Sequence, residues 1–593
     1  MFKTTANKEH DNPILAIKLR SPSSTGATMN KTNSSGYPTM PTTLTTTTPN
    51  LFSSVSTAAG KPGKLPDKQS YGYKQEASFL MYLAAFSSLL GAFSFGLGIG
   101  WSSPAFEQFT YNTSVPQLCE PYDLSLLTWI GSALPLTALF GAAFSDSVVQ
   151  RFGRRIAMIG YCIPLTIGWL LIIVAQSGSV ILTGRIVLGL AIGALSGTVP
   201  GYVNDISTIR IRGTLGALFQ LFIVTGILFA YVIGAFLTWR MASIVSLTPT
   251  ILQAILLYFM PEGPNWLIQR KRLDQAKRSL IRVRSPNSEI DKEFDILVQE
   301  SEQLSKLEKG SIDTVGSLGD DKEKQKQKQT KNGSKWHLYK KKENLVPLIL
   351  SLGLMSFQQF SGVNVVMFYA TPILHEAGSS ITPSLGTILI GLAQWLATFA
   401  SAVLVDLIGR RSLLLISGVV HVISMLLFGV YYHFLQEKET LGWIPVFSMV
   451  IFIIGFAVGW GPIPWLMVAE ITPRETSSLT AACSTTVNWA LAFIVTKTFK
   501  ELQELLTQHG VFYLFSALSA ASVLFTLFCL PETKNKTYEQ IQDFFAGKKS
   551  SGSKTKDGSI GTTGKTSKTN TKPSFLEFSL KDSNSLTRSS DSA

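Results

Sequence analysis

The chain has 593 residues, of which 46% are hydrophobic and only 15% charged, and its formal net charge is +14. Soluble domains carry roughly 25% charged residues, so this composition excludes an ordinary soluble protein. The positive charge does not indicate a nucleic-acid partner, because the Lys and Arg residues stand beside long apolar runs, as the positive-inside rule predicts for membrane proteins.

The N-terminal region, residues 1–77, is rich in Ser, Thr, Lys and Gly and cannot bury enough apolar surface to fold alone. It has no early apolar stretch, so we expect no cleaved signal peptide. Six apolar runs follow, each near the roughly 20 residues that cross a bilayer as a helix. They lie near 78–101, 125–145, 156–176, 181–204, 214–237 and 241–260.

A polar segment, residues 262–344, separates these runs from a second set. Its first part has apolar residues at helical spacing, whereas its later part, Lys322 to Lys342, has the Lys, Gln and Gly composition of a flexible linker. Six more apolar runs lie near 345–374, 384–406, 412–434, 442–469, 479–500 and 511–530, and a polar tail occupies 545–593.

Both tails and the central segment are rich in Lys and Arg and are separated by even numbers of crossings, so all three are expected in the cytoplasm. The sequence therefore predicts an all-α membrane protein with twelve transmembrane helices in two six-helix halves, 78–261 and 345–544. A cytoplasmic, partly helical linker joins the halves, and the two tails are expected to be disordered. The plasma membrane is the expected location, and Asn112, in a glycosylation sequon of the first outside loop, is the expected glycosylation site.

The chain carries no recognisable catalytic or metal-binding pattern. Its four cysteines indicate no disulfide framework, its six histidines lack metal-ligand spacing, and no nucleophile elbow or phosphate loop is present. We therefore expect no enzyme, no cofactor, no metal and no nucleic-acid partner; the sequence leaves the oligomeric state open.

The two halves repeat each other. The loop Arg151 to Arg155 joins the second and third runs, and the loop Asp406 to Arg411 joins the eighth and ninth. An acid, Asp205 or Glu470, ends the fourth and the tenth run. Internal duplication with a binding site between the halves is a common plan for transporters.

Five motifs in order resemble the sugar-porter family of the major facilitator superfamily. They are Gly184-Arg185 with Pro200–Asp205 and Arg212-Gly213, Pro261–Leu267, Gln358–Asn364, Gly461–Trp465 with Glu470, and Pro531–Lys534. The resemblance covers about residues 78–545 and implies transport of a sugar by alternating access. Residues Gly98 to Pro104 look most like animal facilitative glucose transporters and insect trehalose transporters.

A neutral sugar needs side chains that both donate and accept hydrogen bonds, as amides do. Gln358, Gln359 and Asn364 lie within an apolar run, where an unpaired amide is costly, so they are expected to face a wet cavity or each other. A purely structural role, in which they join helices, is the alternative. The resemblance adds four further candidates for the substrate site: Gln220, Gln394, Trp465 and Trp489.

Two sets of gating residues are expected. Pro462 and Pro464 break the tenth run, which implies either a hinge or a static kink, and Tyr369 is a candidate outer gate. The resemblance implies that charged residues at the cytoplasmic helix ends pair in one state and separate in the other; the positive-inside rule alone is the alternative explanation. They are Arg154, Arg155, Asp205, Arg212, Asp406, Arg410, Arg411 and Glu470.

Three positions near this second set, but outside it, depart from the family pattern: Asp146, Gln150 and Ser477. Ser477 stands where the family usually has Arg, so the second-half cluster is expected to be weaker unless Arg474 substitutes.

Gly98 stands where proton-coupled relatives usually carry an Asp, and the first run has no acid. Because an acid inside the membrane is the usual proton carrier, we expect uniport by facilitated diffusion. A proton-coupled sugar or polyol symporter and a non-transporting sugar sensor remain alternatives. Met355-Ser356-Phe357 stands where glucose-preferring relatives often have Gln-Leu-Ser, so glucose, fructose, trehalose and polyols all stay open.

Overall fold

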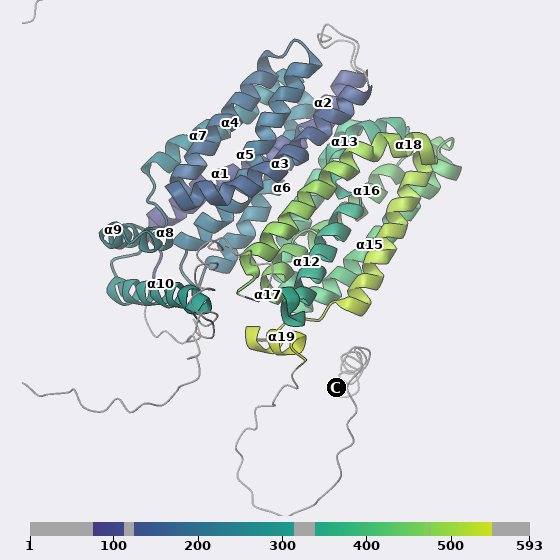
Figure 1. Cartoon of the computed structure of the whole chain (residues 1–593). Coiled ribbons are helices and arrows are strands. Elements are labelled where there is room, and N and C mark those ends of the chain that lie inside the picture. Colours follow the sequence, from purple (N-terminus) through teal and green to yellow (C-terminus); the bar gives the residue numbers. More distant parts are fainter. Residues whose placement is uncertain (1–74, 112–123, 314–338, 474, 548–593) are drawn as a thin grey trace, which may run out of the picture. The chain divides into compact units, whose positions relative to one another are not determined.

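A computed structural model describes residues 75–111, 124–313, 339–473 and 475–547 (Figure 1). The first half consists of α1 (Phe79–Gly100), α2 (Ser102–Tyr111), α3 (Leu124–Phe152), α4 (Arg154–Val174), α5 (Gly178–Ile206), α6 (Arg212–Phe236) and α7 (Trp239–Phe259). The polar segment that follows forms α8 (Pro264–Gln269), α9 (Leu273–Val283) and α10 (Ile290–Asp313).

The second half repeats the helical plan and contains no strand among its described residues. Its elements are α12 (Lys342–Phe360), α13 (Val363–Glu376), α14 (Pro383–Ile408), α15 (Arg410–Val430), the π-helical η2 (Tyr431–Leu435), the 3-10 turn η3 (Glu439–Leu441), α16 (Ile444–Val458), α17 (Ile463–Ile471), α18 (Ser477–Cys529) and α19 (Tyr538–Phe545).

Eleven helical stretches in the described residues are long and apolar enough to cross a membrane. The last of them, α18, has 53 residues and a non-helical backbone at Thr507 (φ 68°, ψ 167°). At about 1.5 Å per residue it is far longer than a bilayer is thick, so it comprises two crossings. The described chain thus has the twelve crossings that the sequence predicts.

The boundaries differ from the predicted runs where a run is broken. The seventh run ends as α12 at Phe360 and restarts as α13 after Gly362, whose φ of +83° is left-handed. The tenth run is interrupted between α16 and α17, with Pro462 in the gap and Pro464 in the first turn of α17. The first run continues beyond its predicted end as α2, to Tyr111.

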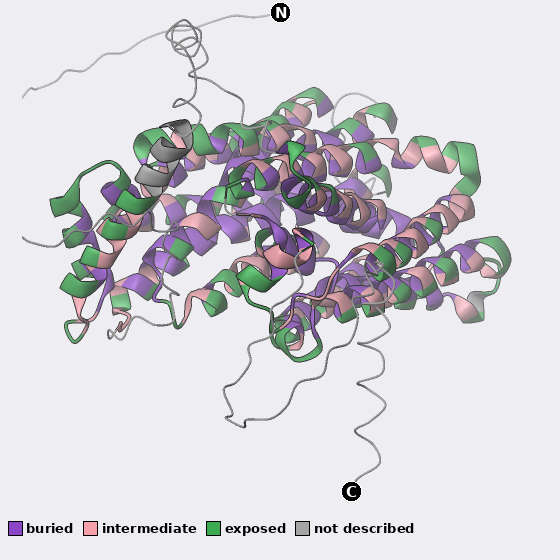
Figure 2. Ribbon diagram, turned by 60° about the horizontal axis from the view of Figure 1, so that its bottom comes forward, coloured by how far each residue is buried: buried purple, intermediate pink, exposed green. Residues whose placement is uncertain are grey.

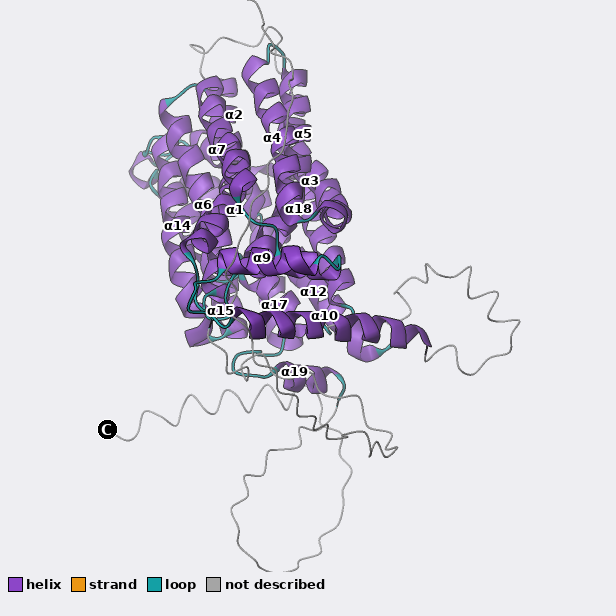
Figure 3. Cartoon of the chain, turned by 90° about the vertical axis from the view of Figure 1, so that its left-hand side faces the viewer, coloured by secondary structure: helices purple, strands orange, loops and turns teal. Residues whose placement is uncertain are grey.

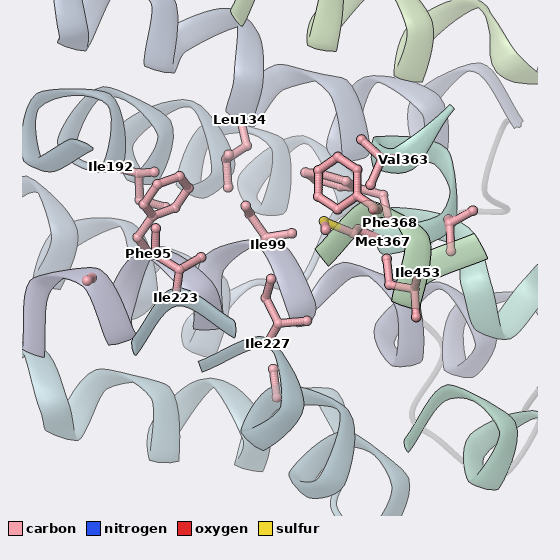
Figure 4. Packing of buried hydrophobic residues seen from close by; sticks show 14 of the residues in the cluster. Phe95, Ile99, Leu134, Ile192, Ile223, Ile227, Val363, Met367, Phe368 and Ile453 are labelled. Carbon is pink, nitrogen blue, oxygen red and sulfur yellow. The ribbon is translucent and has the colours of Figure 1, made fainter. Parts of the chain in front are cut away.

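One apolar core extends through both halves, as a single cluster of buried side chains. Figure 4 shows Ile99 and Leu134 of the first half in this cluster with Val363, Met367 and Phe368 of the second. The halves meet where α3 packs on α18, α6 on α14 and α2 on α13. Buried residues follow the inner faces of the helices (Figure 2), while large apolar side chains such as Phe144 and Ile163 are exposed, as a lipid-facing surface requires.

Helices α8, α9, α10 and α19 lie together at one end of the bundle, with α9 and α10 running across the long helices (Figure 3). We call this the linker end and the opposite one the far end. As the apolar spacing predicts, α9 buries Ala276, Leu280 and Val283.

A buried ion pair fastens this linker to the first half. Arg284 and Glu293 are each only 3% exposed, and their side chains are joined at 2.8 Å. The guanidinium of Arg284 also donates to the carbonyl oxygen of Ile206, at the end of α5, at 2.7 Å. Beside it, the Ser285 amide donates to the Glu76 carbonyl oxygen at 2.9 Å, which ties the linker to the segment before α1.

Candidate functional site

The same arrangement, which we call a corner, occurs once in each half at the linker end: a glutamate after the last crossing caps the start of another helix. The carboxylate of Glu262, just after α7, accepts from the backbone amide of Arg155 at the start of α4 at 3.0 Å. In the second half, the carboxylate of Glu532, after α18, accepts from the amides of Arg410 and Arg411 at 3.1 and 3.0 Å. Each carboxylate thereby satisfies amides that a helix start leaves free and favours the positive end of the helix dipole.

Glycine precedes each of these helix starts for a steric reason. Gly153 and Gly409 have φ values of +93° and +105°, and a Cβ atom there would lie 2.6 Å and 2.9 Å from the carboxylate oxygens of Glu262 and Glu532. Burial raises the pKa of the Glu262 carboxyl above its ordinary value, against the lowering effect of the Arg155 and Gly263 amides. The sequence motifs contain both acids, but their capping role was not predicted; the repeated Pro-Glu after the last helix of each half was the available signal.

Three ion pairs form among the charged residues that the sequence places at the cytoplasmic helix ends, and each lies within one half. Arg154 pairs with Asp205 at 3.0 Å, and Arg410 pairs with Glu470 and with Asp406, both at 3.1 Å. These three pairs therefore join helices of one half to each other and do not connect the two halves.

The other predicted members of this group lie beside those pairs. The guanidinium of Arg155 donates to the carbonyl oxygen of Met260 at 2.6 Å, and that of Arg411 to Leu527 at 2.7 Å. Arg212 begins α6 and interacts electrostatically with Asp205. Arg474, the possible substitute in the second half, and the predicted glycosylation site Asn112 both lie outside the described residues.

Three predicted amides of the second half bond to the protein: Gln358 and Gln359 are buried, and Asn364 is half-buried. Gln358 donates through Nε2 to the carbonyl oxygens of Trp460 and Gly461 at 2.7 and 2.9 Å, at the break between α16 and α17. Its Oε1 atom accepts from Asn488 of α18 at 2.6 Å. Asn364 donates to the side chain of Gln359. The structure thus joins Gln358 to the break of the tenth crossing, a contact across 102 residues that the sequence did not predict.

The remaining predicted substrate residues are distributed over both halves. Gln394 of α14 is buried, Gln220 of α6 is half-buried, and Trp465 of α17 is 42% exposed. Trp489 is buried and packs on Phe95 of the first half, with ring centroids 5.8 Å apart. Its indole Nε1 atom is buried without a hydrogen-bond partner, which makes it available to an acceptor on a ligand.

The two halves bond to each other at the far end. Tyr231 of α6 donates to the carbonyl oxygen of Met367 in α13 at 2.9 Å. The Ser103 and Thr371 hydroxyls lie 2.7 Å apart. Tyr369, the predicted outer gate, stacks on Phe106 of α2 with ring centroids 5.4 Å apart. The far end is therefore closed in this structure, with Tyr369 inside the closure.

Arg185 of α5 is a fully buried cation beside this closure. Its guanidinium donates to the carbonyl oxygens of Gly98 and Ile130 at 2.5 and 3.2 Å and to the Ser102 hydroxyl at 2.6 Å. It also lies over the rings of Trp101 and Phe368, at 5.5 and 6.0 Å from their centroids. Carbonyls, a hydroxyl and ring faces thus surround its charge.

The comparisons with known proteins agree with this architecture. The sequence model of the family described as "Sugar (and other) transporter" matches residues 81–545. The chain belongs to the sugar transporter family. The facilitated trehalose transporter Tret1 of Apis mellifera ligustica is 33% identical over 470 residues, which cover 79% of this chain and 88% of that protein. Tret1 of Bombyx mori is 33% identical over 464 residues, covering 78% and 86% respectively.

Among solved structures, the xylose transporter XylE from E. coli, in a partially occluded inward-open conformation, matches this fold. Its TM-score is 0.61 at 22% sequence identity, over 78% of this chain and 100% of that chain. The twelve crossings therefore adopt the major facilitator fold that the sequence predicts. Membership in the family makes the chain a multi-pass membrane transporter rather than an enzyme.

Proposed function

We propose that this sugar-family transporter is a uniporter that carries a neutral sugar down its gradient by alternating access. The observation that carries the proposal is a group of amides in the second half: Gln358, Gln359 and Gln394 are buried, and Asn364 is half-buried. These side chains offer neutral donors and acceptors, which suit hydroxyl groups. A site for an ionic substrate would be expected to present charge instead.

The arrangement of contacts supports alternating access. The halves bond to each other at the far end through Tyr231 and Ser103, whereas the ion pairs of Arg154 and Arg410 at the linker end stay within one half. A carrier needs two arrangements whose free energies differ by only a few kcal/mol. Hydrogen bonds and ion pairs contribute free energies of this size, so forming them at one end can offset breaking them at the other. We assign the linker end to the cytoplasm, following the positive-inside rule, and the protein to the plasma membrane.

Uncoupled transport fits the environment of Arg185. Helix α1 contains no acidic residue, and Gly98, where a proton-carrying acid would stand, offers Arg185 only its backbone carbonyl. No proton needs to bind or leave for this guanidinium to keep its partners. Trehalose is the first substrate to test, because the relatives from Apis mellifera ligustica and Bombyx mori are described as facilitated trehalose transporters.

The test is uptake by the purified full-length chain in liposomes. Labelled trehalose, glucose, fructose and inositol are offered with and without an imposed proton gradient. Gln358→Ala should abolish uptake, whereas Gln150→Ala, which changes an exposed glutamine at the linker end, should leave it intact. Equilibration of one sugar without dependence on the proton gradient is expected. Proton-driven accumulation would make the protein a symporter, and no flux of any sugar would refute the proposal.

A further inference from the structure

The break between α16 and α17 leaves two carbonyl oxygens without their helical partners. In an α-helix each carbonyl accepts from the amide four residues later, and proline has no amide hydrogen. Pro462 therefore leaves the Val458 carbonyl unpaired by the helix, and Pro464 leaves that of Trp460. Both lie in a buried part of the membrane-spanning bundle, where an unpaired carbonyl is costly.

Side chains from two other helices satisfy these two oxygens. The Ser401 hydroxyl of α14 donates to the Val458 carbonyl oxygen at 3.0 Å. The Gln358 amide of α12 donates to that of Trp460 at 2.7 Å. Each carbonyl that a proline leaves free therefore accepts a hydrogen bond from a side chain of a neighbouring helix.

A third helix, α15, bonds to a backbone amide that the break leaves free. The amide of Gly461, not that of Trp460, donates to the Phe456 carbonyl, at 2.7 Å. The displaced Trp460 amide donates to the Ser417 hydroxyl of α15 at 3.3 Å. That hydroxyl in turn donates to the Gly455 carbonyl oxygen at 2.7 Å, so Ser417 spans the turn before the break.

Gln358 differs from Ser401 and Ser417 because it is also a proposed sugar ligand. An amide nitrogen has two hydrogens, and those of Gln358 go to the carbonyls of Trp460 and Gly461, while its oxygen accepts one bond, from Asn488. Gln358 therefore cannot donate to a sugar hydroxyl without releasing a carbonyl of the break. Ser401 and Ser417 are 2% and 1% exposed and bond only to backbone groups of the break.

We propose that sugar loosens the break by drawing the Gln358 amide away from the Trp460 and Gly461 carbonyls, and that Ser401 and Ser417 are positioning residues that hold the break in its closed geometry. The inference rests on the proposed carrier function and adds how binding is transmitted to the hinge. A released carbonyl must find a new partner, so α17 moves relative to α16 when Gln358 turns to the sugar.

The first test compares net efflux with equilibrium exchange in liposomes, using trehalose or the panel sugar that the wild type carries. If sugar loosens the break, exchange is faster than net efflux in the wild type, because the empty carrier must return with the break held. Ser401→Ala and Ser417→Ala should raise net efflux relative to exchange by about two- to tenfold, the effect of a lost hydrogen bond. Neither serine is a proposed sugar ligand, so the sugar preference should not change.

The matched control is Ser424→Ala, in the same helix as Ser417. Its buried hydroxyl donates only to carbonyls of its own helix, Val420 and His421, so its ratio should equal that of the wild type. Ser417→Thr keeps the hydroxyl and should restore the ratio. An unchanged ratio in both alanine variants, with sugar flux intact, would overturn the inference and leave the carrier proposal standing. Absence of flux in the wild type would remove the carrier proposal itself and this inference with it.

A second readout needs no variant. Binding usually protects backbone amides from hydrogen exchange, but here saturating sugar should increase deuterium uptake over residues 458–466 of the wild type. Increased protection of that segment, measured by mass spectrometry, would contradict the release of the break.

Discussion

Replacing Glu293 by Gln is expected to detach the linker from the first half. The side chains of Arg284 and Glu293 are each 3% exposed and make contacts as short as 2.8 Å. The variant leaves the guanidinium buried beside a neutral amide, whose single oxygen replaces only part of the carboxylate's bonding. Its other oxygen acceptors are the carbonyls of Ile206 and Ser207, at 2.7 and 3.4 Å. Removing one partner of a buried ion pair costs about 3–5 kcal/mol, because the other charge stays buried and uncompensated.

The loss should appear locally, as faster tryptic cleavage within α9 and α10, and as a lower unfolding temperature of the purified protein. Asp291→Asn is the matched control, since its pair with Lys277 is exposed (80% and 48%) and such pairs contribute little. The double variant Arg284→Met with Glu293→Leu should recover much of the loss, because it removes both charges. Wild-type protease resistance in Glu293→Gln, or a double variant no better than the single, would refute this reasoning.

Two further predictions concern the corners and the far end. Gly153→Ala and Gly409→Ala should each destabilise the protein by about 1–3 kcal/mol, because both positions combine a left-handed backbone with a clash against a carboxylate. The effect should be seen as a lower unfolding temperature. Gly160→Ala, with open space around the glycine, should not lower it, and equal effects at all three positions would contradict the steric argument. Tyr231→Phe removes the bond to Met367 across the halves and should shift the equilibrium about fivefold toward an open far end, measured as distances between spin labels; unchanged distances would show that this bond does not hold the closure.

Most of the fold was predictable because lipid imposes a simple rule on sequence. Each crossing needs about 20 apolar residues, and the runs were long enough to find. The exception in the seventh run has a local cause, since Gly362 takes a left-handed conformation that splits it. The turn at Thr507, by contrast, lies in the predicted gap between the last two runs. Glycine within an apolar run indicates a possible break but does not determine it.

The site was less predictable, because pairing partners depend on tertiary structure. The paired arginines and the acids Asp205 and Glu470 came from repetition, and the structure brings them together. The bonds of Gln358 could not be predicted, since they depend on which carbonyls two prolines in another helix leave unpaired. The sequence shows which residues are polar, but it does not show whether their side chains bond to a ligand or to the protein backbone.

The attachment of the short helices offers a way to observe the moving parts from outside. Helix α9 packs with α1 and is anchored through Arg284 to the end of α5, while α19 packs on α12 and α17. A dye on the exposed Lys277 of α9 would therefore move with the first half, and a second dye on α19 would move with the second half. Energy transfer between them would change as the two halves move, with no label in any of the membrane-spanning helices.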